Sequence, residues 1–157
     1  MTKKKIYFYR INKNYIDYLR NFDKNVRKKP NRVYIGIVLS LENYNYFVPL
    51  SSPKTKHQKM KNNIDFLKID KGNLGVLNFN NMIPVDKKDL LYIDFSNIQD
   101  IKYKNLLINQ YRWIDSNKIK IFKKAEKLYN KFIKNELIKN VKERCCNFLL
   151  LEDKLEL

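Results

Sequence analysis

The sequence predicts an α+β protein: a compact, strongly twisted antiparallel β-barrel core with peripheral helices and a long C-terminal helix. Every glycine and proline lies before residue 85, so turns are expected to be frequent in the first half and rare in the second. The apolar segments of the first half are short and rich in Ile, Val, Tyr and Phe, which is typical of strands. In the second half, apolar residues recur at helical spacing.

The first predicted strand covers residues 6–11, where β-forming residues are dense. Asn12 or Asn14 can cap a short helix after it, because an asparagine side chain accepts hydrogen bonds from the first turn of a helix. The apolar residues of that helix fall on one face: Tyr15, Ile16, Leu19 and Phe22.

A β-hairpin is predicted next. Residues 33–39 form the strongest strand, apolar enough to be buried on both faces. A turn at residues 43–45 leads into a second strand over residues 46–50. Because the strands do not alternate regularly with helices, they predict a bent antiparallel sheet. Shorter strands are expected over residues 66–69, 74–79 and 90–93.

The second half predicts two helices. One covers residues 105–113, and Asp115 or Ser116 is expected to cap a longer one. The apolar stripe of the long helix predicts a face that packs on the core rather than a binding groove. It contains Ile121, Phe122, Ala125, Leu128, Tyr129, Phe132, Ile133, Leu137 and Val141. With no repeat and no linker, residues 1–157 predict a single domain.

The charge balance points to an anionic partner. The chain carries 33 Lys and Arg against 16 Asp and Glu, a formal net charge of +17, and 44% of its residues are hydrophobic. So much apolar material predicts a folded protein rather than a disordered polycation. Nucleic acid and anionic membrane are the usual partners of such a surface. The alternative is that part of the excess reflects a lysine-rich proteome, which the many asparagines favour.

Several functional classes lack their motifs. The glycines are isolated, so there is neither a phosphate-binding loop nor a dinucleotide fingerprint, and no cofactor is expected. No cluster of His, Cys, Asp and Glu has metal-ligand spacing, so no metal site is expected either. The segment after Met1 is too short for a secretory signal, and no stretch is long enough to span a membrane. The adjacent Cys145 and Cys146 suggest reduced thiols in a cytoplasmic protein.

The loop after the second hairpin strand contains the most specific chemistry. Ser51 and Ser52 end that strand, Pro53 restricts Ser52 to an extended backbone, and Lys54 follows. RNA contains its own nucleophile, the 2′-hydroxyl, so cleavage requires alignment of that group and stabilisation of the charge that develops on the phosphate. Lysine and hydroxyl donors supply such stabilisation.

The same loop continues with Lys56, His57, Lys59 and Lys61 and has no acidic residue up to Asn63. His57 is the only histidine, and its ordinary pKa makes it a candidate acid or base. A lone histidine in a basic loop is more often solvated or in contact with RNA than catalytic. A lysine whose pKa is depressed by neighbouring cations is the rival candidate.

Other aromatic and basic residues are candidate RNA contacts. Tyr15 and Tyr34 lie near basic residues in the sequence and could stack on bases or donate to phosphates, although both also suit an ordinary core. A second group surrounds Tyr103, for which decoration of a helix surface is the simpler interpretation. The basic candidates are Lys13, Arg32, Lys56, Lys59 and Lys104.

These segments resemble the toxins of type III toxin–antitoxin systems, the ToxN/AbiQ/CptN family of phage-defence endoribonucleases. The resemblance covers roughly residues 5–130, and its most specific part is Pro49-Leu50-Ser51-Ser52-Pro53-Lys54. It continues through 6–9, 14–19, 34–39, 74–78, 81–85 and 103–107.

The resemblance implies a MazF/Kid-like twisted barrel with added helices. It implies metal-independent cleavage of single-stranded RNA that leaves a 2′,3′-cyclic phosphate and a 5′-hydroxyl. The inhibitor would be a repeated pseudoknot RNA that the toxin cuts from its precursor and stays bound to in a closed toxin–RNA assembly. Neither DNA nor a membrane is expected as a partner. The family's catalytic positions fall on Ser51, Ser52, Lys54 and Tyr15, with Tyr34 as a further match.

Two alternatives remain open at this stage. A non-catalytic RNA-binding protein would use the same basic surface for contacts to the RNA backbone. A MazF-like toxin inhibited by a protein would instead need a small acidic partner. The segment from Cys145 to Leu157 lies outside the resemblance, and its apolar and acidic residues are compatible with packing on the core or with fraying.

Overall fold

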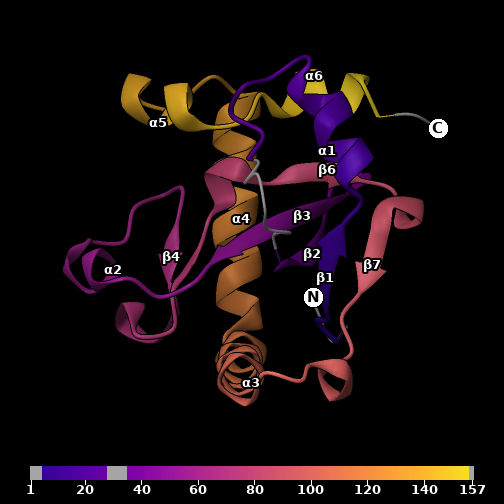
Figure 1. Cartoon of the computed structure of the whole chain (residues 1–157). Coiled ribbons are helices and arrows are strands. Elements are labelled where there is room, and N and C mark those ends of the chain that lie inside the picture. Colours follow the sequence, from indigo (N-terminus) through magenta and orange to yellow (C-terminus); the bar gives the residue numbers. More distant parts are fainter. Residues whose placement is uncertain (1–4, 28–34, 156–157) are drawn as a thin grey trace.

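The computed structural model describes residues 5–27 and 35–155. Its strands form one antiparallel sheet in the order β4-β5-β3-β2-β1-β7, with β6 paired beside β3 (Figure 1). The strands are β1 (Phe8–Ile11), β2 (Ile35–Leu41), β3 (Tyr44–Ser51), β4 (Leu67–Lys68), β5 (Val76–Leu77), β6 (Ile83–Val85) and β7 (Leu90–Tyr92). The predicted α+β class is confirmed. Within the described ranges the pairing does not return from β7 to β4, so the sheet is open and the barrel is not shown.

Helices surround this sheet, and α4 runs along it from one end of the molecule to the other (Figure 1). The α-helices are α1 (Lys13–Arg20), α2 (Thr55–Lys59), α3 (Ile101–Ser116), α4 (Lys118–Ile133), α5 (Lys139–Arg144) and α6 (Phe148–Asp153). The described residues also form four 3₁₀ turns: η1 (Ile69–Gly72), η2 (Phe79–Asn81) and η3 (Lys87–Asp89) connect successive strands from β4 to β7, and η4 (Phe95–Asn97) lies between β7 and α3. Asn12 caps α1 by accepting from the backbone N–H of Asn14, as the sequence predicts.

The predicted hairpin is confirmed as β2 and β3. Leu41 pairs with Tyr44, so the loop between the strands is Glu42-Asn43 and lies earlier than the predicted turn. Glu42 has a φ of 53°, as the tight two-residue hairpin loops require at this position. β3 is longer than predicted at both ends. Its last residue, Ser51, is the first residue of the candidate site.

β4 and β5 are shorter than the strands predicted over residues 66–69 and 74–79, and the tight turn η1 lies between them. Asp70, Lys71 and Gly72 all have positive φ, which ends β4 after two residues. β6 was not predicted, because it contains Pro84, which cannot donate a backbone hydrogen bond to a sheet. Pro84 pairs with Tyr46 on a strand that lies off the main path of the sheet, a position at which a proline is tolerated.

The expected long C-terminal helix is not confirmed. Its first part is α4, but the helix ends at Ile133. Asn135 adopts a φ of 57°, and its backbone N–H donates to the carbonyl of Phe132, a left-handed termination that asparagine permits. Val141, predicted on the same stripe, instead lies on the separate helix α5. The other predicted helix is longer than expected and begins at Ile101, after the cap Asp100.

The C-terminal segment packs on the core. Glu152 of α6 accepts hydrogen bonds from the hydroxyls of Tyr46 and Tyr129, each at 2.6 Å, and so joins β3 to α4. Arg144 of α5 donates to the fully buried carboxylate of Asp65, which lies between α2 and β4. Among the described residues, no helix is long and apolar enough to cross a membrane.

Candidate active site

Ser51, the last residue of β3, lies at the centre of the candidate site. Its side chain is buried, and its Oγ accepts a hydrogen bond from the guanidinium of Arg27 at 2.9 Å and another from Nδ2 of Asn78 at 2.8 Å. A serine hydroxyl has two acceptor sites and one proton. Because both acceptor sites are occupied, the proton of Ser51 is the part that remains to donate to a bound group.

The sheet positions Ser51 through close backbone packing. Ser51 pairs with Val76 of β5, and the backbone N–H of Asn78 donates to the carbonyl of Pro49 at 3.0 Å. Gly75 has a φ of +103°, and a Cβ at this position would lie 1.9 Å from the carbonyl oxygen of Ser51. Only glycine allows this approach, so Gly75 fixes where β3 ends relative to β5.

Ser52, Pro53 and Lys54 lead out from the strand and are exposed. Lys54 is the N-cap of α2, with an extended backbone at φ −136° and ψ 154°. Its side chain therefore starts from the first turn of a short helix whose position is fixed by neighbouring backbone. Ser52 and Lys54 are thus presented to solvent next to the buried hydroxyl of Ser51.

His57 is buried, with only 4% of its surface exposed. Its Nδ1 accepts a hydrogen bond from the backbone N–H of Lys54 at 3.1 Å, and the backbone N–H of His57 donates to the carbonyl of Lys54 at 2.9 Å. Burial is the main cause that lowers the pKa of His57, and the charges of Lys56, Lys54 and Arg27 lower it further. The imidazole is therefore neutral, with its proton on Nε2.

The turn η1 packs against α2. Gly72 has a φ of +92°, and a Cβ there would lie 2.7 Å from the carbonyl carbon and oxygen of His57. The side-chain amide of Gln58 donates to Oδ1 of Asn73 at 3.1 Å. From α3, the buried Gln110 donates to the carbonyl of Leu74 at 2.9 Å. These contacts connect the lysine-bearing loop to the body of the protein.

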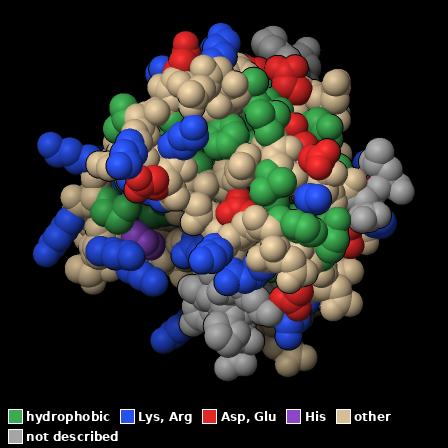
Figure 2. Space-filling model, turned by 90° about the horizontal axis from the view of Figure 1, so that it is seen from above, with side chains coloured by type: hydrophobic (Ala, Val, Ile, Leu, Met, Phe, Trp, Pro, Cys, Tyr) green, Lys and Arg blue, Asp and Glu red, His purple; other side chains and the backbone are tan. Residues whose placement is uncertain are grey.

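Cations gather around this loop. Lys54, Lys56 and Arg27 are all close enough to lower the pKa of His57. Lys56 and Lys59 are exposed, as is Lys61. Figure 2 shows Lys and Arg side chains, in blue, on the side of the molecule where the single histidine, in purple, reaches the surface. A buried donor hydroxyl beside several cations forms a site that suits a phosphate anion.

Tyr15, also predicted for this site, makes its hydrogen bond elsewhere on the sheet. Tyr15 is buried on α1, and its hydroxyl donates to the carbonyl of Pro84 at 2.6 Å. Pro84 pairs with Tyr46, which lies five residues before Ser51 along β3, or roughly 16 Å at the usual rise of a strand. Burial raises the pKa of the Tyr15 hydroxyl far above its ordinary value. In this structure Tyr15 is therefore a buried residue hydrogen-bonded to Pro84, and its assignment to the catalytic site from the resemblance stays a prediction.

The remaining predicted contacts are dispersed. Lys13 is exposed and is the first residue of α1. Tyr103 is 40% exposed and Lys104 half-buried, both in the first turn of α3. Arg32 and Tyr34 lie outside the described residues. His57, predicted as an RNA contact, has most of its surface inside the protein.

Arg27 and Asn78 are the residues that the sequence analysis did not select. Arg27 belongs to a basic connection that reads as an ordinary solvated segment. Asn78 belongs to the matched motif after Gly75, but nothing in the sequence connects it with Ser51, 27 residues earlier. Only the pairing of β3 with β5 brings the two together.

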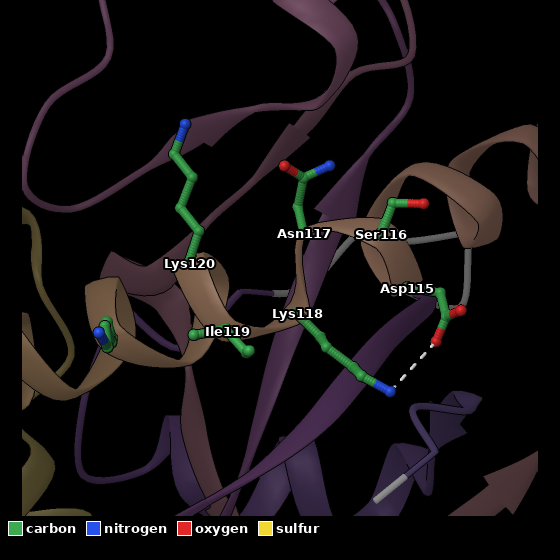
Figure 3. A pocket seen from close by; sticks show the side chains of 7 residues that line it. Asp115, Ser116, Asn117, Lys118, Ile119 and Lys120 are labelled. Atoms are coloured by element: carbon green, nitrogen blue, oxygen red, sulfur yellow. Dashed lines mark ion pairs between the residues drawn. The ribbon is translucent and has the colours of Figure 1, made fainter. Parts of the chain in front are cut away.

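Other hollows on the surface are separate from this cluster. Figure 3 shows one at the junction of α3 and α4, where Lys118 forms an ion pair with Asp115 at 3.7 Å. None of the predicted site residues lines it. Among the described residues, no group of three or more His, Cys, Asp or Glu side chains could hold a metal ion.

Comparison with known proteins agrees with the resemblance seen in the sequence. The family model of the toxin ToxN from type III toxin–antitoxin systems matches residues 7–156. Endoribonuclease ToxN of Pectobacterium atrosepticum is 32% identical over 159 residues, which cover 94% of this chain and 90% of that protein. Endoribonuclease ToxN of Bacillus thuringiensis subsp. kurstaki is 33% identical over 162 residues, covering 95% and 82%. The chain therefore belongs to the ToxN family of type III toxin–antitoxin toxins.

Solved structures show the same fold. A chain from work on a processed non-coding RNA that regulates a bacterial antiviral system is 31% identical, with a TM-score of 0.81 and coverage of 94% and 96%. Another, from work on selective toxin inhibition by a non-coding RNA pseudoknot, is 32% identical, with a TM-score of 0.81 and 96% of each chain covered. AbiQ, a lactococcal anti-phage endoribonuclease, has a TM-score of 0.81 at 27% identity and also covers 96% of each chain.

Proposed function

We propose that this protein is the endoribonuclease toxin of a type III toxin–antitoxin system and that residues 1–157 act as one domain in the cytoplasm. It would cut single-stranded RNA and be held inactive by a pseudoknot RNA that it also processes. Membership of the ToxN family supports this assignment, since the curated relatives are endoribonucleases. The structural observation that carries it is the hydroxyl of Ser51, which is fixed as a donor by Arg27 and Asn78 beside a cationic loop.

In the proposed reaction the 2′-hydroxyl of a nucleotide attacks the adjacent phosphorus. The new bond joins the 2′-oxygen to phosphorus, the bond from phosphorus to the 5′-oxygen breaks, and the products are a 2′,3′-cyclic phosphate and a 5′-hydroxyl. One proton leaves the 2′-oxygen and another reaches the 5′-oxygen. Negative charge accumulates on the non-bridging oxygens during this step, so fixed donors and cations nearby lower the barrier.

The geometry supports distinct roles for the residues of the loop. Ser51 would donate to a non-bridging oxygen, and the exposed Ser52 would contact the same phosphate or its neighbour. The flexible ammonium of Lys54 would follow the charge as it develops or protonate the leaving oxygen. Arg27 would add a fixed positive charge behind Ser51. Lys56 and Lys59 would bind the flanking backbone of the RNA.

We assign His57 a positioning role rather than that of the acid or base. Its Nδ1 accepts the backbone N–H of Lys54 and is therefore not available to take a proton from the substrate. The backbone N–H of His57 also donates to the carbonyl of Lys54, which closes the first turn of α2. The consequence is that the lysine enters the helix in one backbone conformation.

The test is cleavage of a mixed-sequence single-stranded RNA by the purified protein in excess EDTA. Lys54→Ala is run in parallel, with Lys139→Ala as the control because Lys139 is 88% exposed on α5. The proposal expects cyclic-phosphate ends from the wild type and from Lys139→Ala, and a loss of cleavage in Lys54→Ala with RNA binding retained. If all three proteins bind the RNA and leave it intact, the protein is instead a non-catalytic RNA-binding protein.

A further inference from the structure

A second hollow lies on the sheet, away from the Ser51 site, and tyrosines line it. Three tyrosines line it: Tyr7 directly before β1, Tyr9 on β1 and Tyr92 on β7. The ring of Tyr92 lies edge-to-face with that of Tyr7 at 5.7 Å and with that of Tyr9 at 6.3 Å. Tyr7 is 41% exposed and Tyr92 is 61% exposed. The protein therefore holds a small aromatic cluster open to solvent.

Two of these residues are fixed by the sheet rather than by loose loop packing. Tyr9 pairs with Tyr92 across β1 and β7, and on its other side with Gly36 of β2, which pairs with Pro49 of β3. Tyr92 thus lies three strands from Pro49, or roughly 14 Å at the usual strand spacing. The tyrosine hollow is distinct from the Ser51 site and is presented by rigid elements of the same sheet.

The charge of this hollow suits a polyanion. Its lining includes Lys5 and Lys87 and, within the described residues, no Asp or Glu. Asn45 also lines the hollow. Its side-chain oxygen accepts from the hydroxyl of Ser40 at 3.1 Å, and its side-chain NH₂ group can donate to a bound acceptor. Exposed aromatic rings, lysines and an amide donor are the features with which proteins bind unpaired bases and the phosphates beside them.

We propose that the hollow lined by Tyr7, Tyr9 and Tyr92 binds an unpaired stretch of RNA, with bases stacked on the exposed rings of Tyr7 and Tyr92 and phosphates on Lys5 and Lys87. This proposal rests on the proposed function for the identity of the polyanion, and it adds a binding surface outside the catalytic loop. A second copy of the chain is a poor occupant, since each copy carries a formal net charge of +17. A base, in contrast, brings an aromatic face together with the opposite charge of its backbone.

The experiment separates base stacking from attraction to phosphate. Binding is measured with a single-stranded 2′-O-methyl RNA, which lacks the nucleophile and cannot be cut by the proposed mechanism. A second oligonucleotide of the same length is abasic and carries the same number of phosphates. The wild type, the double variant Tyr7→Ala/Tyr92→Ala and the variant Tyr92→Trp are compared with both.

The chain supplies a matched control in Phe22. Its ring is also exposed and lies edge-to-face with a tyrosine, Tyr18, at 5.4 Å, and Lys154 lies 4.7 Å from its centre. Phe22 follows α1 and does not line the hollow. Phe22→Ala therefore removes a comparable aromatic side chain from another part of the surface.

The proposal expects the double variant to bind the base-bearing RNA at least about tenfold more weakly, because it loses the stacking of one or two bases. Its binding of the abasic strand should stay within about twofold, and Tyr92→Trp and Phe22→Ala should bind both strands like the wild type. An equal loss for both strands, or no loss, would overturn the proposal. So would self-association of the wild type, without RNA, that the double variant abolishes.

Cleavage of unmodified RNA by the wild type is assayed separately. If the wild type cuts RNA while the double variant still prefers the base-bearing strand to the same degree, the nuclease function stands and the tyrosine surface is wrong. If the wild type binds neither strand and cuts no RNA, both proposals fail. Circular dichroism of the double variant confirms that the folded protein was compared.

Discussion

Two hydrogen bonds pair His57 with the backbone of Lys54: Nδ1 of the imidazole accepts the Lys54 N–H at 3.1 Å, and the backbone N–H of His57 donates to the Lys54 carbonyl at 2.9 Å. The first of these bonds is the one that the N3 side chain makes in a capping box, with a histidine in the place of the usual Glu or Gln. The only histidine of the chain thus fixes the backbone of the lysine proposed for catalysis. It does so from inside the protein, because His57 is buried.

The first prediction follows from that pair. His57→Gln keeps a side-chain acceptor for the Lys54 N–H, and cleavage should stay within about threefold of the wild type. His57→Leu removes the acceptor, so a cap of about 1 kcal/mol is lost and cleavage should fall by roughly tenfold or more. Single-turnover cleavage at saturating enzyme measures both. Equal and complete inactivation by Gln and Leu would indicate that His57 transfers a proton.

The second prediction concerns pH. Burial and neighbouring cations lower the pKa of His57 below its ordinary 6.5, so the unfolded chain binds a proton more readily than the folded protein. The contribution of His57 to stability is therefore fully present above about pH 6.5 and decreases as the pH falls from there to the lowered pKa. Urea unfolding of the wild type and of His57→Gln between pH 5 and 8 isolates this part. A difference between the two that does not vary with pH would contradict it.

The third prediction tests how Ser51 is oriented. Asn78→Ala removes one of the two donors to the Ser51 hydroxyl, so the hydroxyl rotates and no longer points its proton at one place. We expect a decrease in kcat of about tenfold to a hundredfold with little change in KM. The variant Asn130→Ala, on a half-buried asparagine of α4, is the control. A change confined to KM would show that Asn78 binds RNA directly.

The fourth prediction concerns Gly75. Alanine at this position requires a positive φ and places its Cβ 1.9 Å from the carbonyl oxygen of Ser51. Gly75→Ala should destabilise the protein by at least about 1–3 kcal/mol, and the end of β3 should move. Thermal unfolding measures the first effect, and cleavage at a temperature where the variant is folded measures the second. Full activity of the folded variant would show that the catalytic loop does not depend on this contact.

The fifth prediction concerns the buried ion pair of Asp65 and Arg144. Burial alone would raise the pKa of Asp65, but hydrogen bonds from Arg144 and Asn80 outweigh it and lower the pKa. The resulting stability is present above about pH 4 and is lost as the pH falls through the lowered pKa. Arg144→Met leaves a fully buried carboxylate without its cation and should cost roughly 3 kcal/mol at neutral pH. Chemical unfolding measures the loss, and Asp65→Asn in the same chain should restore part of it.

Local patterns predicted much of the fold because they are decided by short stretches of chain. Strand-forming residues on either side of a short loop predicted the hairpin of β2 and β3, and Asn12 predicted the start of α1. The same local reasoning failed where tertiary contacts compete. The apolar stripe continues to Val141, yet the chain leaves the helix at Asn135. Beyond this turn, the C-terminal segment packs against β3 and Asp65.

The candidate site divides in the same way. The order of Ser51, Ser52 and Lys54 along one loop is a property of the sequence, and it was sufficient to predict an RNA phosphate site. Tyr15 was assigned to that site from the resemblance, although its place on the apolar face of α1 also suited a core. Its hydrogen bond to the carbonyl of Pro84, 69 residues later, could not be predicted from its neighbours in the chain. His57 was identified as the single titratable group near neutrality, but its direction of hydrogen bonding depends on the turn of α2.

The sequence by itself determined the class of fold, the cationic surface and the loop that bears the hydroxyls and lysines, since these depend on composition and on residues close together in the chain. The tertiary structure decided which groups surround Ser51. Arg27 and Asn78 come from 24 residues before it and 27 residues after it. Asn78 reaches Ser51 because β5 pairs with the end of β3 and because Gly75 lets the two backbones touch. Such long-range packing leaves no periodic signal in the sequence.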